Sequence, residues 1–295
     1  MSAPAASAVA RRRAEPLGHR LGRALGRVGL HGLLGLGALS MLMPFFWMLS
    51  TSVKDPGEIF LFPVRWIPSE LHLENYAAAL TALPFDVFFR NTAFVTVVAT
   101  LGQLLSASLV GFGFARLRAP GRGPLFLVLI ATMLLPEQVT MIPHFVIFRN
   151  LGLIDSLWSL IVPSWLGVYA FYIFLCRQFF MQLPLELDDA AKIDGCGFLG
   201  IYWRILLPLS KPVLASVGVF SFLNRWNDFL HAVIYLTSRE RFTISIGLRL
   251  FRDYDGTQWH WLMAASVVTM LPCLAVFFLS QRLFVRGIAT TGLKG

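Results

Sequence analysis

Residues 183–208 read LPLELDDAAKIDGCGFLGIYWRILLP, and this charged segment lies between two long apolar stretches at about 157–176 and 212–236. A helix that crosses the hydrocarbon core of a bilayer needs about 20 apolar residues. Both flanking stretches reach that length, so the segment is expected to be a polar loop between two membrane spans. Four further stretches are long enough, at about 28–50, 88–115, 124–147 and 261–284. The sequence therefore predicts an all-α membrane protein with six transmembrane helices.

The composition agrees with a polytopic membrane protein. Hydrophobic residues make up 56% of the 295 residues, charged residues 14%, and the mean hydropathy is +0.67. Soluble domains are about 25% charged, so a soluble enzyme, a disordered chain and a fibrous protein are excluded. The net charge of +9 does not indicate nucleic-acid binding, because the basic residues occupy short segments between apolar stretches. Three cysteines without a CxxC pair predict reduced thiols and no metal site.

The distribution of Lys and Arg predicts the orientation, because these residues are enriched in cytoplasmic loops. If the N-terminus is cytoplasmic, the inside segments contain sixteen of them and the outside segments eight. Both termini are therefore expected in the cytoplasm. The first apolar stretch is expected to be retained, because it is longer than a secretion signal and no small-residue cleavage site follows it. The expected organisation is a basic tail at 1–27, a membrane domain at 28–284 and a C-terminal tail at 285–295.

Proline and glycine mark expected interruptions of the spans. Pro120-Gly121 predicts the turn between spans two and three, Pro136 and Pro143 interrupt span three, and Pro272 interrupts span six. Broken helices at membrane depth are tolerated where neighbours or water satisfy the freed backbone groups. They therefore point either to a cavity or to plain helix kinks.

The loop itself is expected to contain a short helix at 184–194 and a second at about 197–206. Acidic residues near its start and Lys192 near its end suit the helix dipole, and Gly195 is placed for a left-handed cap. One face is expected to hold Leu187, Ala190, Ala191 and Asp194. Two adjacent alanines would let another protein approach the backbone closely. A surface amphipathic helix without a partner is the other interpretation.

Polar groups within the spans are the second feature of interest, because charges at bilayer depth are costly and usually face an interior. Span five contains Asn224, Arg225, Trp226, Asn227 and Asp228 in succession. Arg225 and Asp228 are three apart and can pair on one face. The cluster is interpreted either as part of a translocation path or gate, with Trp226 offering a flat face to a sugar ring, or as polar contacts that hold span five to a partner subunit.

Five other polar residues lie in apolar stretches, two near Pro136 and three histidines. Glu137 and Gln138, beside Pro136, allow the same two interpretations as the cluster in span five. His31, His144 and His231 show no metal-ligand spacing and are expected to be hydrogen-bonded packing residues.

The loop resembles the EAA loop in membrane subunits of bacterial ABC importers. The family spacing is matched by Asp189-Ala190-Ala191, then Gly195, then Ile205, then Leu207-Pro208. The one departure is Asp189 where the family has Glu, which retains the carboxylate on a shorter arm. Apart from residues 1–27, the rest of the chain is similar to the carbohydrate-uptake branch, typified by the smaller maltose permease subunit. That similarity covers STSVKDPGEIF (50–60), ENYAAAL (74–80), GFARLRAPGR (113–122), LPEQVTMIP (135–143), LGLIDSLWSLIVP (151–163), NRWNDFL (224–230) and GIATTGLKG (287–295).

This resemblance implies that residues 28–284 form a six-span importer permease domain in the bacterial inner membrane. It implies a cytoplasmic coupling helix between spans four and five, which docks on an ATPase. The implied coupling residues are Asp189, Ala190, Ala191, Ile193, Gly195, Ile205, Leu207 and Pro208, and the tail residues Gly292, Lys294 and Gly295 would also reach the ATPase. The chain has no Walker A pattern, so it is expected to be a transport subunit and not an enzyme, with ATP and Mg bound by the partner.

The implied partners are a second homologous permease subunit, an ATPase dimer, an extracytoplasmic solute-binding protein, a sugar and the lipid bilayer. A di- or oligosaccharide is the expected substrate, and a polyol phosphate such as glycerol-3-phosphate is the alternative within the same branch. An ion-coupled secondary transporter is a rival from another class, but it predicts internal repeats that are not detectable here. A membrane enzyme is disfavoured, because no catalytic grouping has usable spacing.

Overall fold

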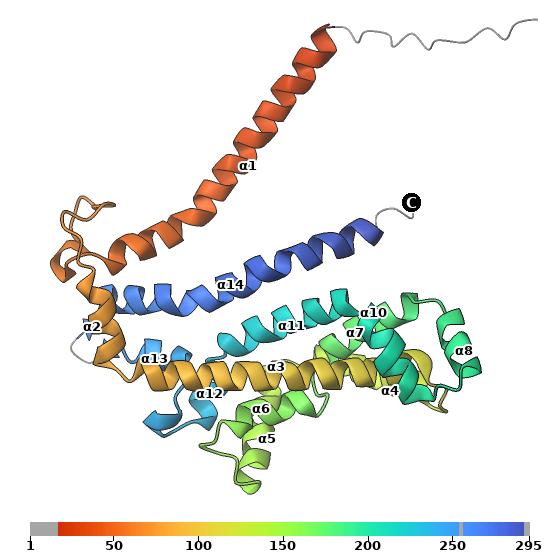
Figure 1. Ribbon diagram of the computed structural model, residues 1–295. Coiled ribbons are helices and arrows are strands. Elements are labelled where there is room, and N and C mark those ends of the chain that lie inside the picture. Colours follow the sequence, from red (N-terminus) through yellow and green to blue (C-terminus); the bar gives the residue numbers. More distant parts are fainter. Residues whose placement is uncertain (1–16, 254–255, 292–295) are drawn as a thin grey trace, which may run out of the picture.

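The computed structural model describes residues 17–253 and 256–291 and consists almost entirely of helices (Figure 1). The first half contains α1 (Leu17–Ser52), η1 (Pro56–Glu58), α2 (Glu74–Ala82), α3 (Phe85–Arg116), α4 (Arg122–Ala131), η2 (Thr132–Leu134), α5 (Glu137–Asn150), α6 (Trp158–Trp165) and α7 (Ala170–Gln182). The second half contains α8 (Glu186–Ile193), α9 (Phe198–Ile201), the π-helical turn η3 (Tyr202–Leu206), α10 (Leu207–Leu209), α11 (Lys211–Trp226), α12 (Leu230–Tyr235), η4 (Arg239–Arg241), α13 (Ile244–Arg249), β1 (Arg252–Asp253), β2 (Gly256–Thr257) and α14 (Trp259–Thr291). The two short strands pair antiparallel.

Four segments of the described chain are long and apolar enough to cross a membrane: Gly26–Ser52, Phe85–Arg116, Trp158–Gln182 and Trp259–Gln281. Two further segments qualify only as bent pairs. One joins Arg122–Leu134 to Glu137–Asn150 with a bend of 103°, and the other joins Phe198–Leu209 to Lys211–Trp226 with a bend of 79°. The described residues therefore contain four candidate spans, or up to six if each bent pair counts as one.

Proline explains some of the breaks but not all of them. Pro136 precedes α5 at the 103° bend, in agreement with the expected interruption of the third apolar stretch. Pro143 and Pro272, however, lie inside continuous helices, so the expected interruptions of the third apolar stretch at Pro143 and of the last at Pro272 are wrong. A proline within a span bends the helix without ending it when neighbouring groups satisfy the freed carbonyl.

Helix α3 is the central element of the bundle. It packs on α7, α11 and α6, while α1 packs mainly on α14 (Figure 1). Gly111 allows α3 and α7 to approach closely, because a Cβ atom at this position would lie 2.8 Å from Cβ of Cys176 and 3.0 Å from the backbone nitrogen of Arg177. Small residues at helix contacts are the usual means by which membrane helices pack tightly.

Two helices extend beyond the packed part of the bundle, α8 and the N-terminal part of α1. At one end, α8 projects beyond the end of α3, as Figure 1 shows. The N-terminal part of α1 leaves α14 and extends away from the bundle in the same view. Its large apolar side chains, such as Leu33 and Met41, are 70% and 74% exposed, as expected for a helix that faces lipid or another subunit.

Candidate functional site

Helix α8 forms as its sequence predicts, between an acidic first turn and a glycine stop. Glu186, Asp188 and Asp189 lie in the first turn, where the helix dipole favours negative charge. Gly195 ends the helix with φ of +80°, and the backbone N–H of Cys196 donates to the Ala191 carbonyl at 2.8 Å. This left-handed turn satisfies the last carbonyls of the helix.

The second helical segment after Gly195 forms close to where it is expected. The helix expected at about 197–206, with its end at Pro208, is present as α9, η3 and α10, and the last of these ends at Leu209. Tyr202 holds this segment to α3, because its hydroxyl lies 2.8 Å from Oγ of Ser108 and both side chains are buried. Leu206 is also fully buried in the same core cluster.

A buried ion pair connects α8 to the end of α3. Nε of Arg116 lies 3.3 Å from Oδ2 of Asp188, and the two side chains are only 4% and 9% exposed. Arg116 also donates from Nη2 to the Leu183 carbonyl at 2.8 Å. Burial raises the pKa of Asp188, and the positive charge of Arg116 opposes that shift. The first turn of α8 is thus fixed to the long central helix.

The opposite face of α8 is exposed as far as the described residues extend. Asp189, Ala190 and Gly195 are exposed, and Ile193 is 87% exposed. Ala191 differs from the expectation that it shares an outward face with Ala190, because it is 4% exposed and packs in the core of this chain. Successive residues of a helix point about 100° apart, and here that rotation carries Ala191 onto the face of α8 that packs on the core while Ala190 stays exposed. Farther on, Ile205 and Leu207 are half-buried and Pro208 is exposed.

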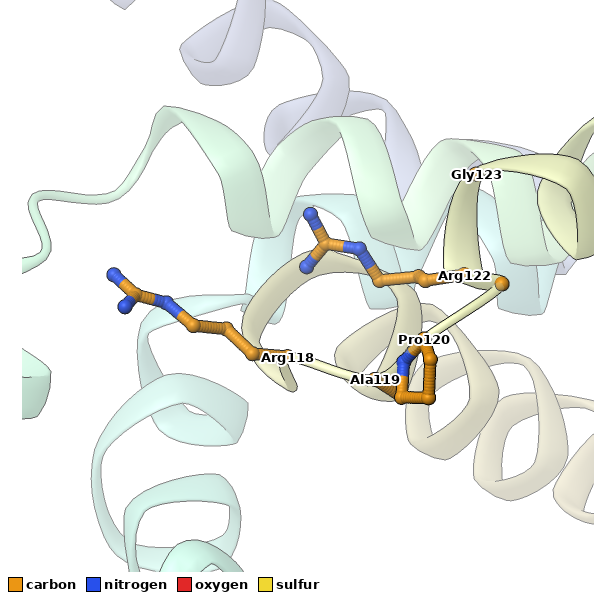
Figure 2. A pocket seen from close by; sticks show the side chains of 6 residues that line it. Arg118, Ala119, Pro120, Arg122 and Gly123 are labelled. Carbon is orange, nitrogen blue, oxygen red and sulfur yellow. The ribbon is translucent and has the colours of Figure 1, made fainter.

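A basic turn connects α3 to α4. Residues 118–123 line a shallow hollow of about 480 Å³. Figure 2 shows the side chains of Arg118 and Arg122 extending to the same side of this turn. Gly121 has φ of +77°, which explains why the Pro120-Gly121 pair forms a turn here. Arg122 donates to the Leu117 carbonyl at 2.8 Å, which fixes the turn.

A larger cavity of about 940 Å³ lies farther along the bundle, where α5, the joint between α6 and α7, and the region from α11 to α12 meet. Its polar lining includes Glu137, Thr140, His144, Tyr169, Asn224, Arg225 and His231. Aromatic and aliphatic side chains form most of the remaining wall. Cavities with mainly apolar walls and a few convergent polar groups are typical of small-molecule sites.

A chain of charged contacts crosses one side of this cavity. Nε2 of His231 lies 3.1 Å from Glu137, and Nδ1 of His231 lies 3.0 Å from Asp228. Asp228 in turn lies 3.4 Å from Nη1 of Arg225, whose guanidinium group stacks over the ring of Tyr169 with 4.6 Å to the ring centroid. The expected pairing of Arg225 with Asp228 is therefore present. His231 adds a contact between the start of α5 and the break before α12.

The residues singled out in the fifth apolar stretch separate in the structure. Asn224 and Glu137 line the cavity and are exposed to it, and Asp228 lies directly behind His231. Asn227 donates to the Leu223 carbonyl at 2.8 Å and Gln138 is exposed, but neither is part of the cavity lining.

Trp226 is placed differently from the hypothesis that it offers a face to a sugar ring. It is 5% exposed, stacks on Phe222 with 5.5 Å between the ring centroids, and donates to the Thr269 carbonyl at 3.0 Å. Phe89 lies edge-on to the same indole at 5.3 Å. In this conformation Trp226 is a packing residue between α11 and α14.

His231 and Tyr169 are the residues that sequence reasoning missed. His231 shows no metal-ligand spacing and is expected to be a hydrogen-bonded packing residue; its hydrogen bond to Asp228 is present, but its place in the cavity lining was not anticipated. Its position three residues after Asp228 was the available signal, because residues three apart share a helix face. No sequence signal places Tyr169 beside Arg225, since the break between α6 and α7 brings them together.

The remaining expectations concern the C-terminal tail, the cysteines and metal ligands. Gly292, Lys294 and Gly295 lie outside the described residues. Cys176, Cys196 and Cys273 are free thiols. Within residues 17–253 and 256–291, no group of three or more His, Cys, Asp or Glu side chains is arranged to hold a metal ion.

The sequence matches a known transport family over most of its length. Residues 107–290 match the model described as "Binding-protein-dependent transport system inner membrane component". The chain is 31% identical over 272 residues to the probable ABC transporter permease protein YurM of Bacillus subtilis, covering 92% of this chain and 90% of that protein.

Two further relatives are named for substrates of different charge. The arabinooligosaccharides transport system permease protein AraQ of Halalkalibacterium halodurans is 35% identical over 261 residues, covering 88% of this chain and 93% of that protein. The sn-glycerol-3-phosphate transport system permease protein UgpE of Yersinia enterocolitica is 32% identical over 266 residues, covering 88% and 94%.

Solved structures show the same fold. A chain of a bacterial ABC transporter involved in the import of the acidic polysaccharide alginate superimposes with a TM-score of 0.79 at 25% identity, covering 90% of this chain and 98% of that one. A second alginate transporter structure, in complex with an alginate pentasaccharide-bound periplasmic protein, has a TM-score of 0.62 at 14% identity.

Proposed function

The chain belongs to the family of inner membrane components of binding-protein-dependent transport systems, and on that premise we propose that it forms half of the translocation path of a saccharide importer. As a member of this family it is a multi-pass permease of the bacterial inner membrane and a transport subunit. ATP and Mg are assigned to a partner ATPase, which this chain contacts through α8.

The exposed face of α8 is the observation that supports this coupling role most directly. Asp189, Ala190 and Ile193 point away from the bundle, while the Arg116–Asp188 ion pair fixes the inner face of the helix to α3. A force applied to the outer face would therefore be transmitted to a helix that crosses the bundle. In the proposed mechanism, closure of an ATPase dimer moves α8 and opens the cavity to the outside, and hydrolysis resets it.

The proposed topology has six spans with both termini in the cytoplasm. The two bent helix pairs are counted as one span each, which places α8 and the basic turn at 118–123 on the cytoplasmic side. The excess of Lys and Arg in the segments on that side supports this orientation. The C-terminal residues Gly292, Lys294 and Gly295 are then on the side of the ATPase.

The proposed path includes the cavity beside α5 and α11, with Glu137 and Asn224 in its wall and Asp228 behind it. The proposed wall does not include Gln138, Trp226 and Asn227, because their side chains do not line the cavity. The proposed substrate is a di- or oligosaccharide, as the name of AraQ suggests for that relative. A polyol phosphate remains the second candidate, because UgpE is named for glycerol-3-phosphate transport.

The proposed partners are a second homologous permease subunit, a pair of ATPase subunits and an extracytoplasmic binding protein. The alginate transporter bound to its periplasmic protein gives a precedent for the last of these. The apolar exposed face of α1 offers a surface for the second permease or for lipid.

A pull-down of the tagged chain from its native cell in mild detergent tests the assembly. We expect mass spectrometry to identify an ATPase, a second permease and a solute-binding protein in stoichiometric amounts. The recovered complex should import saccharide into liposomes only when ATP is supplied. Recovery of the chain alone, or uptake that follows an ion gradient without ATP, would instead support a secondary transporter.

A further inference from the structure

The charges around the large cavity are already paired within the described part of this chain. Arg225 and Asp228 lie 3.4 Å apart with side chains only 6% and 10% exposed, and the Arg225 guanidinium also stacks on Tyr169. An arginine whose charge is balanced and whose face is covered has little capacity left for a ligand. Arg225 is therefore a poor receptor for a phosphate or a carboxylate.

The imidazole of His231 is occupied in the same way. Its two ring nitrogens lie 3.1 Å from Glu137 and 3.0 Å from Asp228, so both positions face carboxylate groups. The remaining imidazole in the lining, His144, stacks on Phe148 with 6.4 Å between the ring centroids. A neutral imidazole can donate to or accept from a hydroxyl group.

Besides His144, the side chains of Glu137 and Asn224 in the wall are open to a ligand. The side chain of Glu137 is 56% exposed, and its carboxylate has more acceptor positions than the contact with His231 uses. Asn224 is exposed in the lining, and within the described residues its side-chain amide has no hydrogen-bond partner. A carboxylate accepts hydrogen bonds from hydroxyl groups, and an amide both donates and accepts.

Aromatic rings complete the wall. Tyr169, Phe171 and Tyr172 lie together at the start of α7, with Tyr169 and Phe171 each packed against Tyr172. Tyrosine combines an apolar face with a polar tip, which suits a ligand with C–H surfaces between hydroxyl groups. The same wall would repel an anion through Glu137, and it has no unpaired Lys or Arg among the described lining residues to offset the cost of removing that anion from water.

We propose that this wall is a subsite for a neutral polyhydroxy ligand, a saccharide without phosphate or carboxylate groups, held by Glu137 and Asn224. The proposal rests on the proposed importer function and makes it narrower, because it selects the saccharide over the polyol phosphate. It also gives this chain a substrate of different charge from that of the structural relative, which takes part in the import of the acidic polysaccharide alginate.

The test uses the complete importer in liposomes with ATP and its binding protein. Radiolabelled maltose, arabinotriose and raffinose serve as neutral probes, and glycerol 3-phosphate and trigalacturonate serve as anionic probes. We expect ATP-driven import of at least one neutral probe, at a rate at least tenfold above either anion. Import of an anion at an equal or higher rate would overturn the proposal while leaving the importer function intact.

Variants of the wall connect the result to these residues. We expect E137Q to lower import of the best neutral probe about tenfold, because the hydrogen bond to a charged carboxylate is replaced by a weaker one to a neutral amide oxygen. N224A should lower it about threefold to tenfold, and it breaks no side-chain hydrogen bond within the described residues. D86N is the matched control, since Asp86 is an exposed carboxylate outside the cavity.

The outcomes distinguish a failure of the proposed ligand site from a failure of the proposed importer function. If E137Q and N224A both import within twofold of the unmodified protein, the wall is not a ligand site, although the importer assignment stands. If no probe of either class is imported with ATP, the importer function itself fails and this proposal fails with it. Tm values of the variants in detergent show whether a loss of import reflects unfolding.

Discussion

Arg116 and Asp188 form a buried ion pair of 3.3 Å that joins the last turn of α3 to the first turn of α8. Oδ1 of Asp188 has no hydrogen-bond partner within the described residues, so the pair depends on the single contact through Oδ2. The carboxylate of Asp188 and the guanidinium of Arg116 are both removed from water here, and each charge is balanced mainly by the other. This pair is the main polar tether of α8 to the bundle.

Replacing Arg116 with Met should therefore loosen α8 and uncouple ATP hydrolysis from transport. Removing one partner of a buried pair typically costs about 3–5 kcal/mol, because the other charge stays buried without compensation. We expect a lower Tm and a several-fold drop in saccharide imported per ATP hydrolysed. Both quantities are measured on the complete importer in liposomes and in detergent.

The control for this prediction is Arg118→Met, at an exposed arginine two residues farther along the chain. The double variant R116M/D188L should recover much of the Tm, because a buried ion pair can often be replaced by apolar side chains without loss of stability. If R116M and R118M behave alike, the pair contributes nothing to the coupling.

Gly195 offers a second test of the coupling role, because its backbone conformation restricts the choice of residue although there is open space for a side chain. Its φ of +80° disfavours residues with a Cβ, and no atom lies within 4 Å of the position that a Cβ would occupy. Asn tolerates this backbone conformation, so G195N adds bulk to open space with little strain. We expect G195N to lower ATP-driven import several-fold if an ATPase docks against this turn.

Gly197 is the matched control for that experiment. Its φ is −74° and an added Cβ would also meet nothing within 4 Å, so G197A should import normally. Comparison of Tm values excludes unfolding of G195N. Normal import by G195N, with an unchanged ATPase rate, would count against docking at this turn.

Asp155 predicts an acid-sensitive turn between α5 and α6. It has φ of +55°, and its Oδ1 accepts from the backbone N–H groups of Thr237 and Ser238 at 2.9 Å each. Hydrogen bonds from the Ser238 hydroxyl and these N–H groups lower the pKa of Asp155 from 3.8 to about 2. Because the pKa is lowered on folding, the stabilisation is present above pH 3.8 and is lost as the pH falls toward 2.

We therefore expect D155N to have a lower Tm than the unmodified protein at pH 6, and the difference to shrink between pH 4 and pH 2.5. Asn keeps the tolerance for positive φ but lacks the charge, so the comparison isolates the carboxylate. Differential scanning fluorimetry in detergent gives both Tm series. A Tm difference that does not change with pH would show that the charge of Asp155 is not responsible.

The sequence was a good guide to features that depend on local spacing. Apolar stretches of about 20 residues indicated where most of the long helices lie, and Gly195 indicated where α8 ends. The contact between Arg225 and Asp228 followed from their separation of three residues. These features are set by helix geometry and by the conformational freedom of glycine, both of which can be read from neighbouring residues.

Features that depend on packing between distant segments were not predictable in this way. The contact of His231 with Glu137 requires the bend at Pro136 to meet the break before α12. The burial of Trp226 depends on Thr269 and Phe89, which are far away in the sequence. Ala191 turned inward because α8 is fixed by Arg116, and the two adjacent alanines gave no sign of which one would be exposed.

The close contact of α3 with α7 gives the last prediction, which concerns folding and not transport. A Cβ atom at Gly111 would lie 2.8 Å from Cβ of Cys176 and 3.0 Å from the backbone nitrogen of Arg177, so the two helices would have to separate. Overpacking of this kind typically costs about 1–3 kcal/mol, and G111A should lower the Tm in detergent. At Gly113, on the same helix, an added Cβ meets nothing within 4 Å, so G113A should leave the Tm unchanged or raise it slightly. Equal Tm values for the two variants would mean that α3 and α7 do not approach as closely as the structure has them.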